Sequence, residues 1–321
     1  MKKRLRTLAG AALIALLTQP ALASWPDDKP IEIVVGFAAG GGTDLLARKL
    51  APFVQKRLGG KSQFIVVNKP GAAGEIANAY LARAQPDGYT IGIVNVPGFL
   101  FLPMTKKAQY APEDMRLLAR IVDDPTVLVT RADSPLSSLP ATVAALRAKP
   151  GSVSVGHNGT GTNGDLALQL LTDATKAEAN FIPFKGTSAQ KTDLMGGHLD
   201  VAAISAGEVP ELHGGKTAPL KVLVQFSAKR SAALPNVPTA QESGIPVVMS
   251  SERGFAAPKG VPDAIVQKLE AAIAEAVRDP EFVAGAAGDA PVLAYLPGAQ
   301  WNESLNQNRK ALRALADKMP K

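Results

Sequence analysis

Short apolar runs alternate with amphipathic ones along most of the chain. Ile31–Phe37, Phe64–Asn68 and the end of "PDGYTIGIVN" are continuous apolar stretches, which predict buried strands. Between the first two, apolar residues from Leu46 to Leu58 recur at helical spacing, and Gly59-Gly60 end that predicted helix. A second helix is expected in "KPGAAGEIANAYLARA". Strands that alternate with helices indicate a parallel sheet with right-handed crossovers.

The alternation recurs in the second half of the chain. Predicted strands there are "TVLVT", "SVSVG", "NFIPFKG", "LDVAAIS" and "LKVLVQF", and predicted helices are "SLPATVAALRAK", "LALQLLTDA" and "SAQKTDLMGG". The residues after Phe226 are rich in turn formers through "GFAAPKGVP", and two helical patterns, "DAIVQKLEAAIAEAV" and "GAQWNESLNQNRKALRALADK", follow. Two α/β units in 321 residues favour two lobes over one domain.

Each α/β unit contains a glycine-rich turn that follows a strand and opens a helix. The first is Gly40–Asp44 and the second is Gly156–Asn163, "GHNGTGTN". Glycines let backbone N–H groups approach a ligand closely, and a helix N-terminus carries partial positive charge, so an anion is the natural guest. Ligands of parallel sheets bind at the carboxyl ends of the strands. We therefore expect the two turns to face one cleft.

The residues after the first glycines indicate which anion is bound. A phosphate-binding Walker loop needs Gly-Lys-Ser/Thr, whereas Thr43 and Asp44 follow here, and the spacing of a dinucleotide fingerprint is absent. A carboxylate held by N–H groups and the Thr43 hydroxyl fits better, with Thr43 or Asp44 as the helix cap. A plain tight turn is the alternative.

Several side chains near the turns could contact such a ligand. Thr160, Thr162 and Asn163 supply neutral donors in the second turn, and His157 is expected to form hydrogen bonds there. Lys185, before Gly186 and Thr187, and Arg253 are cations that could bind a carboxylate. The alternative for both cations is a solvated surface position.

Composition excludes several classes of function. The sequence has no cysteine, which removes disulfides and thiol chemistry, and its histidines are not spaced as metal ligands. No G-x-S-x-G elbow follows a strand, and acids are scarce at the predicted strand ends apart from Asp44. We expect no metal, no cofactor and no catalytic residue. The sequence does not exclude paired carboxylates of the kind that glycosidic chemistry uses, so an enzyme is the third interpretation.

The N-terminal segment has the pattern of a secretory signal peptide. "MKKRLR" precedes the apolar "LAGAALIALL", and Ala21-Leu22-Ala23 is an A-x-A-type site, so we expect cleavage after Ala23 and a periplasmic protein. A membrane anchor is the alternative, but the run is short for one and no later segment is long and apolar enough to span. Without the four basic residues of this segment the formal charge falls from +7 to +3, so we expect no nucleic-acid partner.

Five stretches in register resemble the Bug-type receptors of tripartite tricarboxylate transporters, the TctC-like family. They are "WPDDKPIEIVVGFAAGGGTDLLARKLA", "VVNKPGAAGEIANAYLARAQPDGYTI", "FIPFKGTSAQKTDLMGGHLDVAAIS", "SAKRSAALPNVPTAQESGIP" and "GFAAPKGVP". The resemblance implies an α/β two-lobe periplasmic-binding-protein (Venus-flytrap) fold, with a mainly parallel sheet in each lobe and crossover strands between them. After the signal peptide expected at 1–23, we expect lobe 1 at 24–124 plus 226–321 and lobe 2 at 125–225.

The resemblance also implies a function and a site. The expected protein is a monomeric, non-enzymatic receptor that holds a small mono-, di- or tricarboxylate, aromatic and amino acids included, and delivers it to integral membrane transporter subunits. A periplasmic sensor acting on a regulatory membrane protein is the alternative. An Arg-Gly at Arg253 resembles the citrate-type branch, which makes Arg253 a candidate selector for a second carboxylate. The candidate ligand-binding residues are Phe37, Gly41, Gly42, Thr43, Asp44, Asn95, His157, Asn158, Thr160, Thr162, Lys185, Gly186, Thr187, Ser205 and Arg253.

Overall fold

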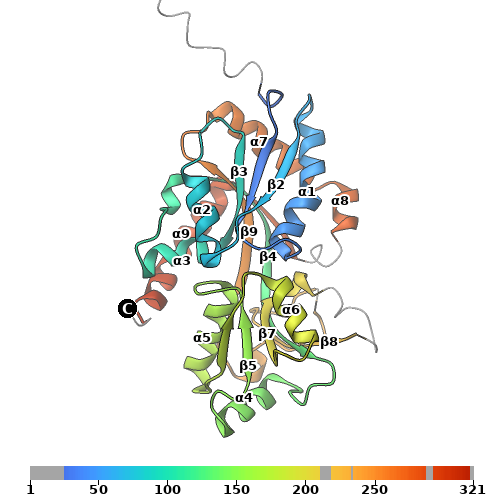
Figure 1. Ribbon diagram of the computed structural model, residues 1–321, viewed down its shortest axis with the longest axis vertical. Helices are drawn as coiled ribbons and strands as arrows, with labels where there is room; N and C mark the ends of the chain where they lie inside the picture. Colours follow the sequence, from blue (N-terminus) through green and yellow to red (C-terminus); the bar gives the residue numbers. More distant parts are fainter. Residues whose placement is uncertain (1–24, 210–217, 233, 287–291, 319–321) are drawn as a thin grey trace, which may run out of the picture.

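The chain folds into two α/β lobes that lie one above the other along the long axis of the molecule (Figure 1). The computed structural model describes residues 25–209, 218–232, 234–286 and 292–318. The expected signal peptide, residues 1–23, lies outside the described residues. Within them, no helix combines the length and the apolar character needed to cross a membrane.

The sheet of the first lobe is mixed. Its first three strands are parallel, as their alternation with helices predicts, and the others pair antiparallel. In spatial order the strands are β2 (Phe64–Asn68), β1 (Ile31–Val35), β3 (Thr90–Val96), β9 (Ser250–Pro258), β4 (Met115–Arg131) and β10 (Leu293–Pro297).

The sheet of the second lobe repeats this plan. Its parallel part contains the strand that leads into the second glycine-rich turn, and β4 enters antiparallel. In spatial order the strands are β6 (Asn180–Pro183), β5 (Ser154–His157), β7 (Val201–Ser205), β4 and β8 (Leu220–Gln225).

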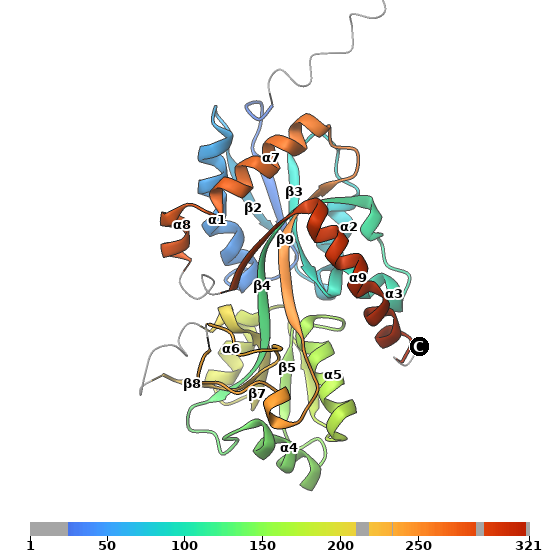
Figure 2. The same cartoon turned by 180° about the vertical axis from the view of Figure 1, so that it is seen from behind.

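Strands β4 and β9 connect the lobes, and Figure 2 shows both running from the upper lobe into the lower one. β4 pairs with β9 as far as Pro125 and with β7 from Thr126 onward. These strands run in opposite directions between the lobes, which makes both sheets mixed. The expectation of two lobes with crossover strands is confirmed.

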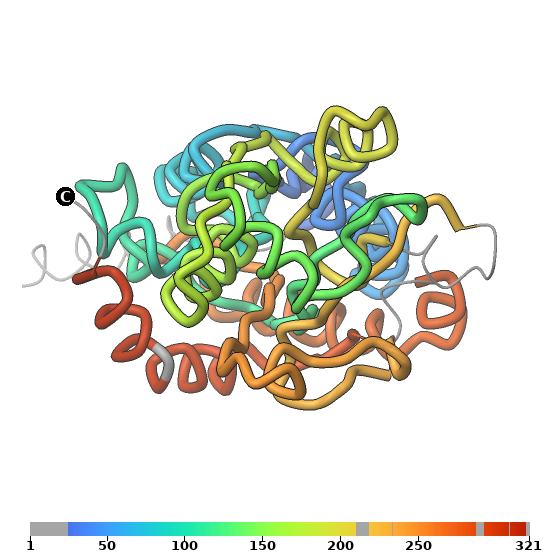
Figure 3. The backbone as a smooth tube through the Cα atoms, turned by 90° about the horizontal axis from the view of Figure 1, so that it is seen from below, coloured from blue at the N-terminus to red at the C-terminus, as the bar shows by residue number. Residues whose placement is uncertain are grey.

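Helices cover both faces of each sheet. Leu50 of α1 and Val266 of α7 pack in one core cluster of the first lobe, and Leu100 of α3 and Trp301 of α9 pack in another. Helix α9 runs along one edge of the molecule when it is viewed from below (Figure 3). The helices are α1 (Gly42–Leu58), α2 (Glu75–Ala82), α3 (Gly98–Thr105), α7 (Asp263–Ala276), α8 (Pro280–Gly285) and α9 (Gly298–Ala316) in the first lobe, and α4 (Leu139–Ala148), α5 (Asn163–Thr175) and α6 (Thr187–Met195) in the second.

The segment after Phe226 packs differently from our expectation. Phe226, Ala240 and Val247 belong to the core cluster of the second lobe, together with Leu128 and Leu168. We expected residues 226–321 in the first lobe. We propose instead that the chain re-enters the first lobe only along β9, at about residue 250.

The predictions of individual strands and helices are confirmed where the apolar pattern was continuous. The strand predicted at Phe64–Asn68 is β2, and the predicted helices coincide with α1, α2, α4, α5, α6, α7 and α9 within a few residues. The expectation that Thr43 or Asp44 caps α1 is wrong. The helix begins at Gly42 with Gly41 as its N-cap, so both residues lie inside the first turn.

Candidate functional site

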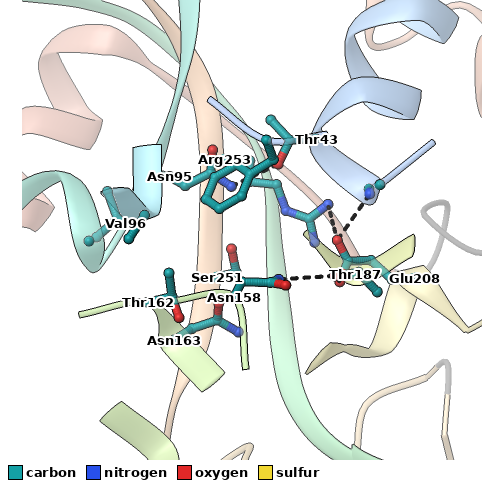
Figure 4. A pocket seen from close by; sticks show the side chains of 15 residues that line it. Thr43, Asn95, Val96, Asn158, Thr162, Asn163, Thr187, Glu208, Ser251 and Arg253 are labelled. Atoms are coloured by element: carbon teal, nitrogen blue, oxygen red, sulfur yellow. Dashed lines mark hydrogen bonds and ion pairs between the residues drawn. The ribbon is translucent and has the colours of Figure 1, made fainter. Parts of the chain in front are cut away.

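A pocket lies between the lobes, beside the crossover strands. Its cavity is small, with a volume of about 20 Å³. Figure 4 shows side chains from both lobes pointing into it. Its lining residues are Phe37, Gly41, Gly42, Thr43, Ala73, Asn95, Val96, Gly98, Asn158, Thr162, Asn163, Thr187, Glu208, Ser251 and Arg253.

The N-termini of three long helices line this pocket. α1 begins beside it at Gly42, α5 at Asn163 and α6 at Thr187. The N-cap residue of each helix forms no side-chain capping hydrogen bond. First-turn N–H groups without an intrahelical partner and the partial positive charge of a helix N-terminus both favour an anion, and the N–H of Gly42 at the start of α1 already donates to the Glu208 carboxylate at 3.1 Å. This convergence is the main electrostatic feature of the pocket.

The glycine-rich turns before α1 and α5 are built in the same way. The third residue of each helix, Asp44 or Asp165, accepts a hydrogen bond from the N–H of a glycine four residues earlier, at 2.9 Å for Gly40 and 2.7 Å for Gly161. Both glycines have positive φ, +79° and +83°, which other residues rarely adopt. Each aspartate therefore folds its turn back over the helix start.

Asp44 is thus a residue that shapes the turn and does not line the pocket. It is 2% exposed and also accepts hydrogen bonds from Arg48 and Asn68 at 2.9 Å. Burial by itself raises the pKa of the Asp44 carboxyl, but the hydrogen bonds from Arg48, Gly40 and Asn68 outweigh it and lower the pKa below its ordinary value.

We expect Asp44→Asn to lower the free energy of unfolding at pH 7 by about 1–2 kcal/mol, because charge-assisted hydrogen bonds are lost. A folded-state pKa below the unfolded value stabilises the fold above about pH 4, and this contribution disappears as the pH falls through the folded pKa. The difference from the parent protein should therefore shrink between pH 7 and pH 3 in urea titrations. Asp173→Asn, at an exposed position, is the control, and an equal pH dependence of the two differences would contradict the role of Asp44.

Glu208 is a pocket residue that the sequence did not single out. It follows β7 on a single 3₁₀ turn, Ala206–Glu208, and its side chain is 8% exposed. Oε1 accepts a hydrogen bond from the N–H of Gly42 at 3.1 Å, and Oε2 accepts from Thr187 Oγ1 at 2.8 Å and the N–H of Ser205 at 3.2 Å. The Glu208 carboxylate therefore bridges the two lobes.

Arg253 lines the pocket as expected, but its guanidinium already faces carboxylates of the protein. It is 1% exposed and forms a buried ion pair with Asp124, which is fully buried. Its Nη1 lies 3.8 Å from Oε1 of Glu208 (Figure 4). Asp124 also accepts a hydrogen bond from the N–H of Gly207 at 3.0 Å. The charge of Arg253 is thus largely balanced within the protein.

Amide and hydroxyl side chains link the turns around the pocket. Asn95 donates to Thr43 Oγ1 at 2.9 Å within the first lobe. Asn158 donates to Thr187 Oγ1 at 3.0 Å within the second. Asn163 donates to Thr126 Oγ1 at 2.8 Å. These bonds orient neutral polar groups toward the space between the lobes.

The structure brings nine of the fifteen candidate residues to the pocket and places the others elsewhere. Thr160 and Lys185 line a neighbouring cavity that shares Phe37, Ala73 and Asn158 with the pocket. The pocket lining contains Phe37, Gly41, Gly42, Thr43, Asn95, Asn158, Thr162, Thr187 and Arg253, and it does not contain Asp44, His157, Thr160, Lys185, Gly186 or Ser205.

His157 lies behind the second turn. Its side chain is 6% exposed, its ring meets the Phe181 ring edge-on, and its Nδ1 lies 3.7 Å from Oδ1 of Asp165. Gly186 and Ser205 are also buried, and Ser205 instead donates its N–H to Glu208. Among the described residues, no group of histidine, aspartate and glutamate side chains could hold a metal ion.

Ala73, Val96, Gly98, Glu208 and Ser251 line the pocket without having been proposed. A signal existed for Glu208, because it is an acid three residues after the predicted strand "LDVAAIS", at a strand end where a ligand is expected. No sequence pattern indicated Ser251 as a pocket residue, because its segment was not predicted to be a strand.

Comparison with known proteins identifies the family. Residues 46–313 match the model of the TctC family, described as tripartite tricarboxylate transporter family receptor. Protein BugT of Bordetella pertussis is 35% identical over 274 residues, which are 83% of this chain and 82% of that protein. The UPF0065 protein in the gbd 5' region of Cupriavidus necator is 33% identical over 315 residues, 97% of this chain and 94% of that protein.

Solved structures agree with the fold. The periplasmic binding protein BugD superimposes with a TM-score of 0.83 at 29% identity, covering 91% of this chain and 97% of BugD. Rhodopseudomonas palustris Rpa4515, solved with adipate, gives 0.80 at 26% identity over 92% and 96% of the two chains. MatC of the same organism, solved with bound malate, gives 0.80 at 25% over 90% and 99%. The chain therefore belongs to the TctC family of tripartite tricarboxylate transporter receptors, which are periplasmic solute-binding proteins, and it has their two-lobe fold.

Proposed function

We propose that this protein captures a small organic carboxylate in the pocket between its lobes and delivers it to the membrane subunits of a tripartite tricarboxylate transporter. The observation that carries the proposal is the convergence of the N-termini of α1, α5 and α6 on one pocket, where none of the three N-cap residues forms a side-chain capping hydrogen bond. Such a site stabilises a carboxylate by N–H groups and helix dipoles. The adipate and malate bound to the neighbours Rpa4515 and MatC are of this chemical class.

Export of the protein is part of this proposal. We propose that residues 1–23 form a signal peptide that is removed after Ala23, and that the mature chain acts in the periplasm as a monomer. The family consists of receptors, and we propose binding without turnover for this chain as well.

The contacts between the lobes suggest how a ligand would act. The N–H of Ala38 donates to the carbonyl of Lys185 at 3.3 Å, and the Gly42–Glu208 hydrogen bond also joins the lobes. A ligand that contacts both lobes binds the closed arrangement better than an open one and shifts the population toward it. We propose that the transporter recognises the closed form.

A thermal-shift screen of the mature protein against mono-, di- and tricarboxylates, with and without amino groups, tests the proposal. Ligand binding to the folded state raises the melting temperature by mass action, and calorimetry then gives the affinity. At least one carboxylate should bind at micromolar or lower concentration and remain chemically unchanged. Turnover of the compound, or no binding by any carboxylate, would contradict the proposal.

We expect Gly42→Ala to weaken binding of the carboxylate found by the screen at least tenfold while the fold is retained. A Cβ at this position would lie 2.3 Å from Oε1 of Glu208 and 2.5 Å from Nη1 of Arg253, so both side chains must shift inside the pocket. Gly285→Ala is the control, because Gly285 is outside the pocket lining and a Cβ there would have no atom within 4 Å. Calorimetry on both variants checks this, and equal affinities would contradict the assigned site.

A further inference from the structure

We propose that the pocket selects carboxylates that also carry an ammonium group, as amino acids do, and that Glu208 is the residue that contacts the ammonium. This inference rests on the proposed function and names its substrate class more narrowly. It separates this chain from the neighbours solved with adipate and malate, because neither compound carries a positive charge.

The charges at the pocket are the first argument. Among its lining residues in the described part of the chain, the ionisable side chains are those of Glu208 and Arg253. The Arg253 guanidinium forms its ion pair with the fully buried Asp124. Two carboxylates therefore share one guanidinium, and the formal charges of the three side chains sum to −1.

The position of Glu208 is the second argument. Three hydrogen bonds fix its carboxylate, with Oε2 accepting two of them from Thr187 and Ser205. Oε1 accepts one, from the N–H of Gly42, and a carboxylate oxygen can accept two. Oε1 can therefore accept a further charge-assisted hydrogen bond from a ligand. Because the side chain is 8% exposed, an opposite charge placed there is weakly screened.

The remaining helix N-terminus provides the place for the ligand's own carboxylate. Glu208 contacts the starts of α1 and α6, through Gly42 and Thr187. The start of α5, at Thr162 and Asn163, lines the same pocket, and its N-cap side chain forms no capping bond. A zwitterion can thus direct its carboxylate to α5 and its ammonium to Glu208.

A second carboxylate on the ligand has no comparable partner in this pocket. Lys106 and Lys185 line the neighbouring cavity, and Lys191, which is outside the pocket lining, donates to the backbone carbonyl of Glu208 at 3.1 Å. Lys106 already pairs with Glu75, at 2.5 Å. A dianion in the pocket would therefore add negative charge beside Glu208, which opposes binding.

Isothermal calorimetry on the mature protein with matched compound pairs tests the inference. Each pair has one carbon skeleton with and without an amino group: aspartate and succinate, glutamate and glutarate, 4-aminobutyrate and butyrate. We expect the amino member of at least one pair to bind at least tenfold more tightly. Glu208→Gln keeps the shape and removes the charge, and it should reduce this preference at least tenfold. Glu178→Gln, at an exposed position outside the pocket lining, should leave the preference unchanged.

The results of this experiment distinguish failure of the ammonium preference from failure of the proposed carboxylate-receptor function. Tighter binding of the unsubstituted acid in every pair would overturn the ammonium preference while leaving a carboxylate receptor. A preference that persists in Glu208→Gln would remove Glu208 from its assigned role. Binding by neither member of any pair would overturn the inference, and it would contradict the proposed function only if the wider carboxylate screen were also negative.

Discussion

Arg253→Met should lower the free energy of unfolding by about 3–5 kcal/mol, because it leaves the Asp124 carboxylate fully buried without its positively charged partner. The buried pair lies where β4 and β9 run beside each other between the lobes, at Asp124 and Arg253. Both strands run between the two lobes, so the lost stability should lower the midpoint of the global unfolding transition. Urea unfolding followed by circular dichroism measures it.

Two further variants identify the cause. Arg253→Met combined with Asp124→Asn removes both charges, keeps an acceptor for the Gly207 N–H, and should recover most of the lost stability. Arg131→Met breaks an exposed ion pair with Asp133, whose side chain is 65% exposed, and should leave the unfolding midpoint almost unchanged. If Arg253→Met and Arg131→Met behave alike, the Arg253–Asp124 pair has no special structural role.

Gly254→Ala should destabilise the protein by about 3 kcal/mol or more, because the added methyl group meets backbone atoms that cannot move independently. An ideal Cβ would lie 2.2 Å from the carbonyl oxygen of Ala119, 2.8 Å from Cα of Arg120 and 2.6 Å from the Trp301 ring. Gly254 pairs with β3 on one side and β4 on the other, so relief requires separating strands or displacing α9. Overpacking of a core usually costs about 1–3 kcal/mol, and contacts with backbone raise that cost.

Gly285→Ala is the matched control for this substitution. Gly285 is the last residue of α8, and a Cβ there would have no atom within 4 Å. Alanine favours a helix over glycine by about 1 kcal/mol, so this variant should be as stable as the parent protein or slightly more so. Equal unfolding midpoints for the two alanine variants would show that β9 tolerates a side chain at Gly254.

Strand β9 shows why part of the fold was missed from the sequence. Its segment contains Glu252, Arg253 and Gly254, which do not look like a buried strand, yet all three are buried. Glu252 accepts hydrogen bonds from Arg120 at 2.9 Å and from the Trp301 indole at 2.8 Å. Partners that lie 49 to 132 residues away in sequence make these polar groups suitable for the interior. No local pattern reports such partners.

The sequence by itself determined the elements whose signals are local, namely the apolar strands, the amphipathic helices and the two glycine-rich turns. It also predicted that these turns meet in one cleft, because the carboxyl ends of parallel strands share an edge. Only the tertiary structure decided the charge of that cleft. Asp124, Glu208 and Arg253 come from three separate segments, and burial couples their charges, so whether Arg253 can receive a ligand carboxylate depends on neighbours that periodicity and spacing cannot reveal.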